Sequence, residues 1–306
     1  MKEIFLGNTG KKVPAIVVGC MRISHKSREE MQRFIHTALD MGANYFDHAD
    51  IYGGGESEKR FGDALAADGA VKREDMFLQS KCGIRQGFFD FSEEYILSSV
   101  DGILKRLQTE YLDALLLHRP DALMEPEEVA SAFDKLERSG KVRHFGVSNF
   151  RPTQIELLKK AVHQPLIINQ LQFSIPVSNM VAAGLEANMT TAGSADRDGN
   201  VLDYSRLNDI TIQAWSPFQM ENWQGCFIDS DKFPELNAEM DRMAAHYGVT
   251  KTTLATAWIL HHPARMQVVS GTASEQRLRE IVAAGQIQLT REEWYRLYLA
   301  AGHILP

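Results

Sequence analysis

Long apolar runs are missing from this sequence. No stretch approaches the roughly 20 consecutive apolar residues of a membrane-spanning helix, and the segment from Met1 to Gly7 has an early acid where a secretory signal is apolar. Cysteine is scarce: Cys20, Cys82 and Cys226 are scattered and form no CxxC pair, which is typical of a cytoplasmic protein. Acids outnumber bases, and the net charge of −7 disfavours nucleic acid and anionic membranes as partners.

Several motifs of common enzyme classes are absent as well. No GxGxxG follows a strand pattern, and Gly53-Gly54-Gly55 lacks the Lys-Ser/Thr of a phosphate-binding loop. The absence of HExxH and GxSxG disfavours a zinc protease and an α/β-hydrolase. His261 and His262 precede Pro263 at a predicted helix end and are interpreted as surface or capping residues, so no metal site is expected.

A regular alternation of short and long patterns is what the sequence does contain. Eight short runs rich in β-branched residues or leucine alternate with longer helical patterns. The predicted strands are Ala15–Gly19, Asn44–Asp47, Met76–Ser80, Leu112–Leu117, Val142–Val147, Leu166–Gln170, Thr211–Ala214 and Met266–Ser270. This repetition predicts a (β/α)8 TIM barrel, and without an internal repeat or linker, residues 1–306 are expected to form one domain.

Local signals sharpen three parts of this prediction. Ser27 and Glu30 fit a capping box before a helix that Gly42 ends. Residues 4–6 and 12–14 flank a turn and predict a hairpin across the N-terminal mouth of the barrel. Residues 177–206 are turn-rich and are interpreted as a loop or an insertion before a helix.

Proton-active side chains follow three of the predicted strands. Asp47 and Tyr52 lie five residues apart after the second strand, Lys81 follows the third strand, and His118 follows the fourth. The C-terminal ends of parallel barrel strands carry the chemistry, so these residues are expected to meet. A free tyrosine has a pKa of about 10, and a nearby ammonium lowers it. Lys81 is therefore expected to lower the pKa of Tyr52, Asp47 to anchor Lys81, and His118 to orient a carbonyl.

This set suits carbonyl reduction with hydride from a separate carrier. Each residue alone has an ordinary alternative: a capping carboxylate, a packed ring, a solvated lysine or a core histidine. Their position at three consecutive strand ends favours the functional interpretation. A hydrolase that uses Asp47 and Asp50 as paired carboxylates is a weaker alternative, because it leaves Tyr52 and Lys81 unexplained.

The same residues lie in segments that resemble the aldo-keto reductase family, in a form similar to its bacterial branch. Residues 46–53, FDHADIYG, are similar to its FDTAxxYG signature, with His48 where the family usually has Thr. Five further segments follow in the family's order. They are Ser80-Lys81, Leu116-Leu117-His118, Gly146-Val147-Ser148-Asn149-Phe150, Asn169-Gln170 and Trp215-Ser216-Pro217, with Trp215 where Tyr is usual.

The resemblance implies a role for each matching residue. Tyr52 is implied as the general acid, with Lys81 and Asp47 tuning it and His118 orienting the substrate. Nicotinamide contacts are implied for Ser148, Asn149, Gln170, Trp215 and Ser216, and further cofactor contacts for Gly19, Met21 and Arg22.

After the last strand, the family commonly has Lys-Ser and then Arg five residues on. Here these positions are Gly271, Thr272 and Arg277. Because Arg277 keeps its offset and can fork onto a 2′-phosphate, NADPH is expected rather than NADH.

The substrate is left open between two types. Phe88, Phe89, Phe218 and Trp223 are candidates for an apolar pocket, whereas Arg22 and Arg119 suit a carboxylate. A small-molecule carbonyl compound is the expected partner, and the chain is expected to be a monomer or a weak homo-oligomer. The alternative function is a cofactor-binding sensor or regulatory subunit with little turnover.

Overall fold

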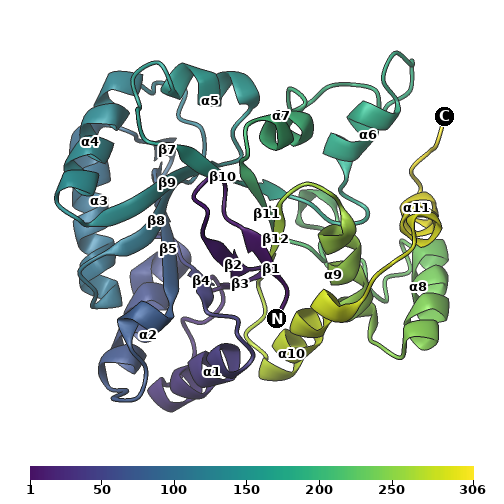
Figure 1. Cartoon of the computed structure of the whole chain (residues 1–306), viewed down its shortest axis with the longest axis horizontal. Coiled ribbons are helices and arrows are strands. Elements are labelled where there is room, and N and C mark those ends of the chain that lie inside the picture. The colour runs from purple at the N-terminus through teal and green to yellow at the C-terminus, as the bar shows by residue number, and fades with distance from the viewer.

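Eight parallel strands close into a barrel in the computed structural model, which describes all residues from 1 to 306 (Figure 1). The strands are β3 (Ile16–Gly19), β4 (Tyr45–Asp47), β5 (Phe77–Cys82), β8 (Leu112–Leu117), β9 (Val142–Ser148), β10 (Leu166–Gln172), β11 (Thr211–Trp215) and β12 (Met266–Ser270). Their order around the ring is β10-β11-β12-β3-β4-β5-β8-β9. The predicted (β/α)8 barrel is confirmed, and each predicted strand matches one of these to within two residues at either end.

Helices surround the barrel and bury their apolar sides against it. They are α1 (Arg28–Asp40), α2 (Glu56–Ala66), α3 (Glu93–Leu107), α4 (Pro126–Arg138), α5 (Pro152–Leu158), α7 (Val201–Leu207), α9 (Lys251–His261) and α10 (Glu275–Ala283). In α1 the predicted capping box is present, since Ser27 and Glu30 bond to each other's backbone N–H. Met31, Phe34 and Ile35 then face the core.

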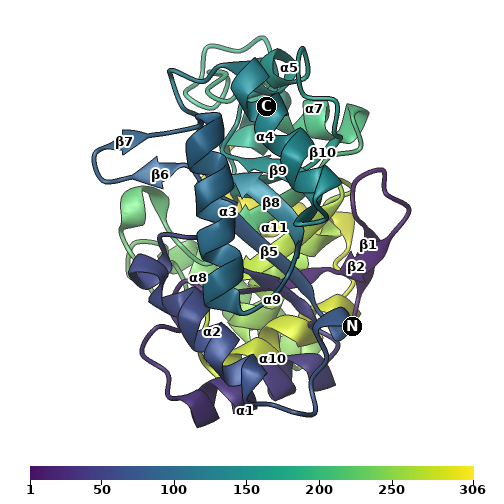
Figure 2. The same cartoon turned by 90° about the vertical axis from the view of Figure 1, so that its left-hand side faces the viewer.

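The N-terminal hairpin closes one end of the barrel. Strand β1 (Glu3–Phe5) pairs antiparallel with β2 (Lys12–Pro14). Leu6 and Val13 belong to a buried cluster with side chains from the barrel strands, including Val17, Tyr45 and Phe77. The predicted hairpin is therefore confirmed in the position expected for it. Figure 2 shows a second hairpin, β6 (Ile84–Arg85) and β7 (Phe88–Phe89), on the opposite side of the molecule.

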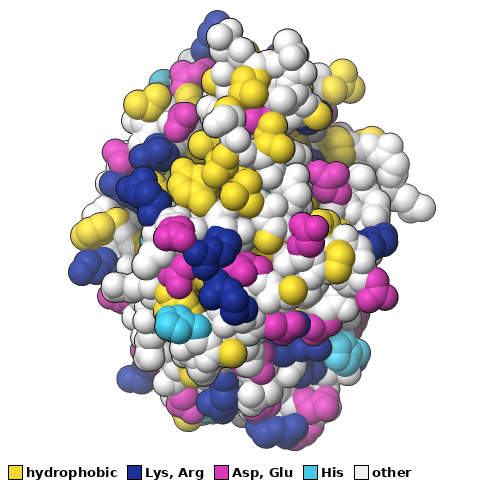
Figure 3. Space-filling view, turned by 90° about the vertical axis from the view of Figure 1, so that its right-hand side faces the viewer, with side chains coloured by type: hydrophobic (Ala, Val, Ile, Leu, Met, Phe, Trp, Pro, Cys, Tyr) yellow, Lys and Arg dark blue, Asp and Glu magenta, His cyan; other side chains and the backbone are white.

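Three helices are additional to the barrel repeat. The irregular segment from 177 to 206 contains α6 (Asn179–Leu185) and then a loop that leads into α7, so it is an insertion before a barrel helix. Helices α8 (Pro234–Tyr247) and α11 (Arg291–Ala300) pack together, and Glu239 of α8 pairs with Arg296 of α11. Figure 3 shows this side of the molecule, where acidic and basic side chains are interspersed. None of the helices combines the length and the hydropathy of a membrane-spanning segment.

Candidate active site

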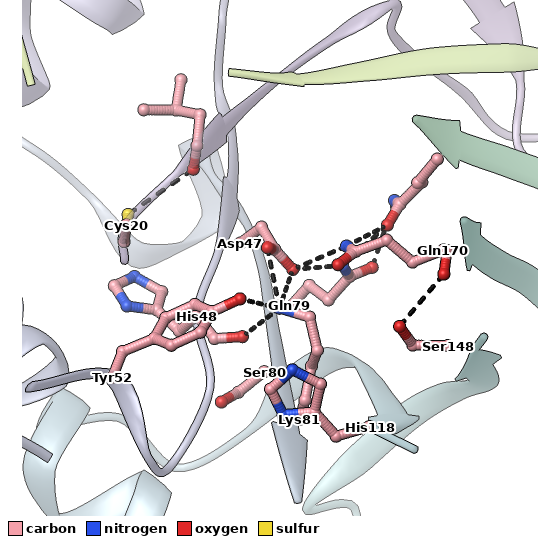
Figure 4. A network of polar contacts seen from close by, with 12 residues as sticks. Cys20, Asp47, His48, Tyr52, Gln79, Ser80, Lys81, His118, Ser148 and Gln170 are labelled. Atoms are coloured by element: carbon pink, nitrogen blue, oxygen red, sulfur yellow. Dashed lines mark hydrogen bonds and ion pairs between the residues drawn. The ribbon is translucent and has the colours of Figure 1, made fainter. Parts of the chain in front are cut away.

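Lys81 is the centre of the polar contacts at the C-terminal end of the barrel (Figure 4). It lies inside β5, and its Nζ donates to both carboxylate oxygens of Asp47 at 2.8 Å and to the backbone oxygen of His48 at 2.7 Å. The Nζ also lies 3.0 Å from the Tyr52 hydroxyl. Lys81 and Asp47 are both buried. The arrangement matches the sequence-based expectation that Asp47 anchors a lysine beside the phenol.

The charge of Lys81 is maintained by these partners. Burial alone lowers the pKa of a lysine, because the charged form loses its hydration. Here the Asp47 carboxylate and the Tyr52 hydroxyl outweigh burial, and the net pKa of Lys81 is raised. The side chain therefore remains an ammonium at neutral pH.

Tyr52 is subject to two opposing effects on its pKa. Burial raises the pKa of its phenol, and the Lys81 ammonium opposes this rise without reversing it. Lys81 therefore lowers the pKa of Tyr52 as expected, but burial has the larger effect and the net pKa is raised. The lysine's charge is largely balanced by Asp47, which itself disfavours a phenolate. Tyr52 thus holds its proton at neutral pH and remains a potential donor.

Turns on both sides of Tyr52 determine where it lies. Tyr52 begins the short 3-10 helix η1 (Tyr52–Gly55), which leads directly into α2. Gly53 has a φ of +60°, and a Cβ there would lie only 2.9 Å from the Cβ of Ser24. Before Gly53, the Tyr52 backbone N–H donates to the backbone oxygen of Ala49 at 3.0 Å, and this turn lets two residues five apart both reach Lys81.

His118 is the fourth residue of the set proposed from the sequence to be catalytic. It follows β8, and its ring centroid lies 6.0 Å from that of Tyr52, with the two planes 82° apart. Burial and then the charge of Lys81 lower the pKa of His118 well below its usual value. The imidazole is therefore neutral at physiological pH, and a neutral imidazole keeps one N–H to donate to a carbonyl oxygen.

The paired-carboxylate alternative does not fit this geometry. Asp47 is bound to Lys81, whereas Asp50 accepts hydrogen bonds from Tyr95 at 3.0 Å and Ser99 at 2.8 Å, both on α3. Asp50 is not among the residues that line the pocket. The two acids therefore do not act on one ligand.

Buried glutamine side chains form a hydrogen-bonded row that begins at Asp47. Gln79 Nε2 donates to Asp47 at 2.5 Å and to Gln213 at 2.8 Å, and Gln213 donates to Gln267 at 2.9 Å. Gln267 then donates to the backbone oxygen of Pro14 in the N-terminal hairpin at 2.7 Å. The row runs through the barrel interior and connects both of its ends.

This row of glutamines was not predicted from the sequence. Its signal was a glutamine inside a predicted barrel strand, as in Phe77–Cys82, Thr211–Trp215 and Met266–Ser270. Buried polar groups need partners, so three such strands in one barrel indicate an internal network.

A pocket of about 550 Å³ opens beside Tyr52 and His118. All eleven residues predicted to bind the cofactor line it: Gly19, Met21, Arg22, Ser148, Asn149, Gln170, Trp215, Ser216, Gly271, Thr272 and Arg277. Phe218 and Trp223 line it as expected, but Phe88 and Phe89 do not. They are 54% and 42% exposed on β7, so the interpretation of them as pocket residues is wrong.

The residues expected to hold the nicotinamide contact one another. Asn149 donates to Ser148 Oγ at 2.8 Å and accepts from the Trp215 indole N–H at 3.0 Å, while Ser148 donates to the backbone oxygen of Gln170 at 3.0 Å. Asn149 and Ser216 have φ values of +63° and +51° at the ends of β9 and β11. Backbone in this left-handed region is strained for non-glycine residues and is concentrated at functional sites.

The Trp215 indole has a neighbour that the sequence did not indicate. Trp223 stacks on it with ring centroids 5.4 Å apart and the planes 22° apart. A nicotinamide ring could therefore stack on only one face of the Trp215 indole.

The part of the pocket that follows β12 fits a phosphate-bearing group. A Cβ added at Gly271 would meet nothing within 4 Å, so the space beside this residue is open. Arg277 lies in the first turn of α10, and its guanidinium has no ion pair within the chain. A helix N-terminus and a free arginine both favour an anion.

The barrel, the buried lysine and the cofactor-sized pocket define a class of oxidoreductase. The chain belongs to the aldo/keto reductase family, whose model matches residues 15–299.

Relatives from bacteria agree with this assignment. The chain is 33% identical to the oxidoreductase YdhF of Escherichia coli (strain K12), with 100% of both chains covered. It is also 33% identical to 6-dehydroglucose reductase of Agrobacterium fabrum, over 94% of this chain and 93% of the relative. Among solved structures, the thermostable aldo-keto reductase Tm1743 is similar at a TM-score of 0.79 and 28% identity, covering 98% of this chain and 100% of that one. The chain is thus an oxidoreductase that acts on carbonyl compounds.

Proposed function

We propose that this protein reduces an aldehyde or ketone to an alcohol with NADPH, and that Tyr52 supplies the proton. The observation that carries the proposal is the Lys81 ammonium, which lies 2.8 Å from Asp47 and 3.0 Å from the Tyr52 hydroxyl. Tyr52 in turn lines a pocket together with His118. A buried cation beside a protonated phenol stabilises the charge that the phenol carries after it has given up its proton.

The chain's own residues perform the proton half of the reaction. His118 donates a hydrogen bond to the carbonyl oxygen and orients it toward Tyr52. As the oxygen gains negative charge, Tyr52 transfers its proton, and Lys81 stabilises the phenolate until solvent returns a proton. When bound, the reduced nicotinamide supplies the hydride that the carbonyl carbon receives. Ser148, Asn149, Gln170 and Trp215 are the residues that would hold its ring and carboxamide.

NADPH is preferred to NADH because Arg277 lies at the pocket without a counter-ion. Guanidinium groups bind phosphate through paired hydrogen bonds. Thr272 also lines this part of the pocket, where Gly271 replaces the family's usual lysine. The relative named 6-dehydroglucose reductase supports a carbonyl compound as the substrate.

The test is a turnover assay with purified protein, NADPH and the reactive aldehyde 4-nitrobenzaldehyde. We expect oxidation of NADPH together with formation of the nitrobenzyl alcohol, measured by chromatography. If NADPH binds tightly in calorimetry but no aldehyde or ketone in a broad panel is reduced, the protein is instead a cofactor-binding sensor.

A further inference from the structure

The pocket contains three arginines without an anionic partner in the chain. Arg22, Arg119 and Arg277 all line it, and no ion pair involves any of them. Asp47 is the only carboxylate among the lining residues, and it is paired with Lys81. The charge that the pocket offers to its ligands is therefore strongly positive.

The order of strands around the barrel separates these arginines into two groups. Arg277 follows β12, and Arg22 follows the adjacent strand β3. Arg119 follows β8, which lies four strands from β12 in either direction around the ring, and its side chain extends to the Trp215 ring at the end of β11. The proposed contact with the 2′-phosphate accounts for Arg277. It does not account for Arg119.

The surroundings of Arg119 suit a substrate group. Arg119 is the next residue after His118, which is proposed to hold the carbonyl oxygen. Its guanidinium lies 5.7 Å from the centroid of the Trp215 ring and makes no hydrogen bond to the chain. The side chain is half-buried, and this burial lowers the pKa of Arg119. A cation that is partly removed from water without a counter-ion is costly, and a ligand anion offsets that cost.

We propose that Arg119 binds an oxyanion, either a carboxylate or a phosphate, on the substrate whose carbonyl lies at Tyr52 and His118. This inference rests on the proposed reductase function and specifies its substrate as an anionic aldehyde or ketone. The planar guanidinium fork matches both anions through two parallel hydrogen bonds. Arg119 thereby acts as a specificity-determining residue and contributes to substrate binding rather than to proton transfer.

Two pairs of substrates test the proposal, each differing mainly in charge. One pair is 4-carboxybenzaldehyde and methyl 4-formylbenzoate, and the other is glyceraldehyde 3-phosphate and glyceraldehyde. For Arg119→Gln, we expect kcat/KM for the charged member of at least one pair to fall about tenfold or more through KM, as for a lost charge-assisted hydrogen bond. The value for the neutral member is expected to stay within about twofold. The pair that responds identifies the anion as carboxylate or phosphate.

Two further variants make the result specific. Arg119→Lys keeps the charge and is expected to retain part of the preference for the anion, because a lysine lacks only the fork. Arg138→Gln makes the same change in net charge on α4, outside the lining of the pocket. It is expected to leave the ratio of kcat/KM between the charged and the neutral member unchanged in both pairs.

The outcomes separate this inference from the proposed function. Equal losses for charged and neutral substrates in Arg119→Gln, or no change in either pair, overturn the anion-binding role while the reductase function stands. If the wild-type protein reduces none of the four compounds and no other aldehyde, the reductase function itself is overturned, and the role of Arg119 with it.

Discussion

The two parts of the proposed site differ in how complete they are without a ligand. Around Lys81 the chain supplies its own partners: Asp47, the His48 backbone and Tyr52 take up the hydrogen bonds of a buried ammonium. Around Arg277 the chain supplies no counter-ion, and the arginine is exposed beside open space at Gly271. The proposed proton-donor part is thus organised by folding, whereas the proposed phosphate part would be completed by its ligand. Substitutions in the first part should alter stability as well as rate, and those in the second only cofactor choice.

The largest expected effect follows from removing the proton donor. Tyr52→Phe keeps the ring and removes the hydroxyl, so turnover should fall by about 10²- to 10⁴-fold, the range for loss of a general acid. The NADPH dissociation constant should change little, because the ring still fills its place. Steady-state kinetics and a fluorescence titration with NADPH measure the two quantities. A variant with unchanged kcat would show that another group supplies the proton.

Removing the buried cation should destabilise the fold itself. Lys81→Met leaves the Asp47 carboxylate buried without its partner, and loss of one member of such a pair costs about 3–5 kcal/mol in the free energy of unfolding. In the double variant Lys81→Met/Asp47→Asn, much of this loss should be recovered. Arg277→Met is the matched control and should change stability by less than about 0.5 kcal/mol, because that side chain is exposed. Urea unfolding of the four proteins decides between these expectations. Similar losses at Lys81 and Arg277 would contradict the comparison.

The sequence predicted the parts of the molecule that local pattern encodes. Each barrel strand shows as a short apolar run, and the α1 start shows as Ser27 and Glu30. The candidate catalytic set was predictable because strand ends in a barrel converge, so position along the chain implies position in space. The family resemblance added the residues proposed to bind the cofactor, which all line one pocket.

The remaining features depend on contacts between distant residues. Gln79 and Gln213 are 134 positions apart, and nothing local to either glutamine indicates the other. The pKa of Tyr52 is raised because the phenol is deeply buried. The charged neighbours of Tyr52 could be predicted from the sequence, but the extent of its burial could not. Phe88 and Phe89 were misplaced for a similar reason, because a short hairpin turns them outward.

A smaller effect concerns the pH dependence of the proton-donor part. His48 is buried, neither of its ring nitrogens has a partner, and its ring packs edge-on against Phe61 at 4.7 Å. Burial and the charge of Lys81 lower its pKa to about 3. This value is below the pKa of about 6.5 that His48 has in the unfolded chain. The unfolded chain therefore binds a proton that the folded protein does not, and the free energy of unfolding decreases as the pH falls from 6.5 toward 3.

The variant His48→Thr isolates this contribution. Between pH 7 and pH 5, wild-type stability should fall by about 2 kcal/mol more than that of the variant. His163→Thr removes an exposed histidine and should leave the wild-type pH dependence unchanged. Urea unfolding at both pH values gives the difference for each protein. Parallel curves for His48→Thr and the wild type would show that His48 does not stay neutral in the folded state.

The smallest effect is expected in the phosphate part, and it is the one that distinguishes the two parts most directly. Arg277→Gln should weaken the binding of NADPH by about tenfold and change the binding of NADH little, because only NADPH carries the 2′-phosphate. The free protein should keep its melting temperature, since Arg277 makes no ion pair that folding could lose. Thermal shifts with each cofactor and without cofactor supply all three measurements. If the binding of both cofactors is weakened equally, Arg277 contacts a group that they share, such as the pyrophosphate. A lower melting temperature of the free variant would instead show that this part of the site, like the surroundings of Lys81, is organised before the ligand arrives.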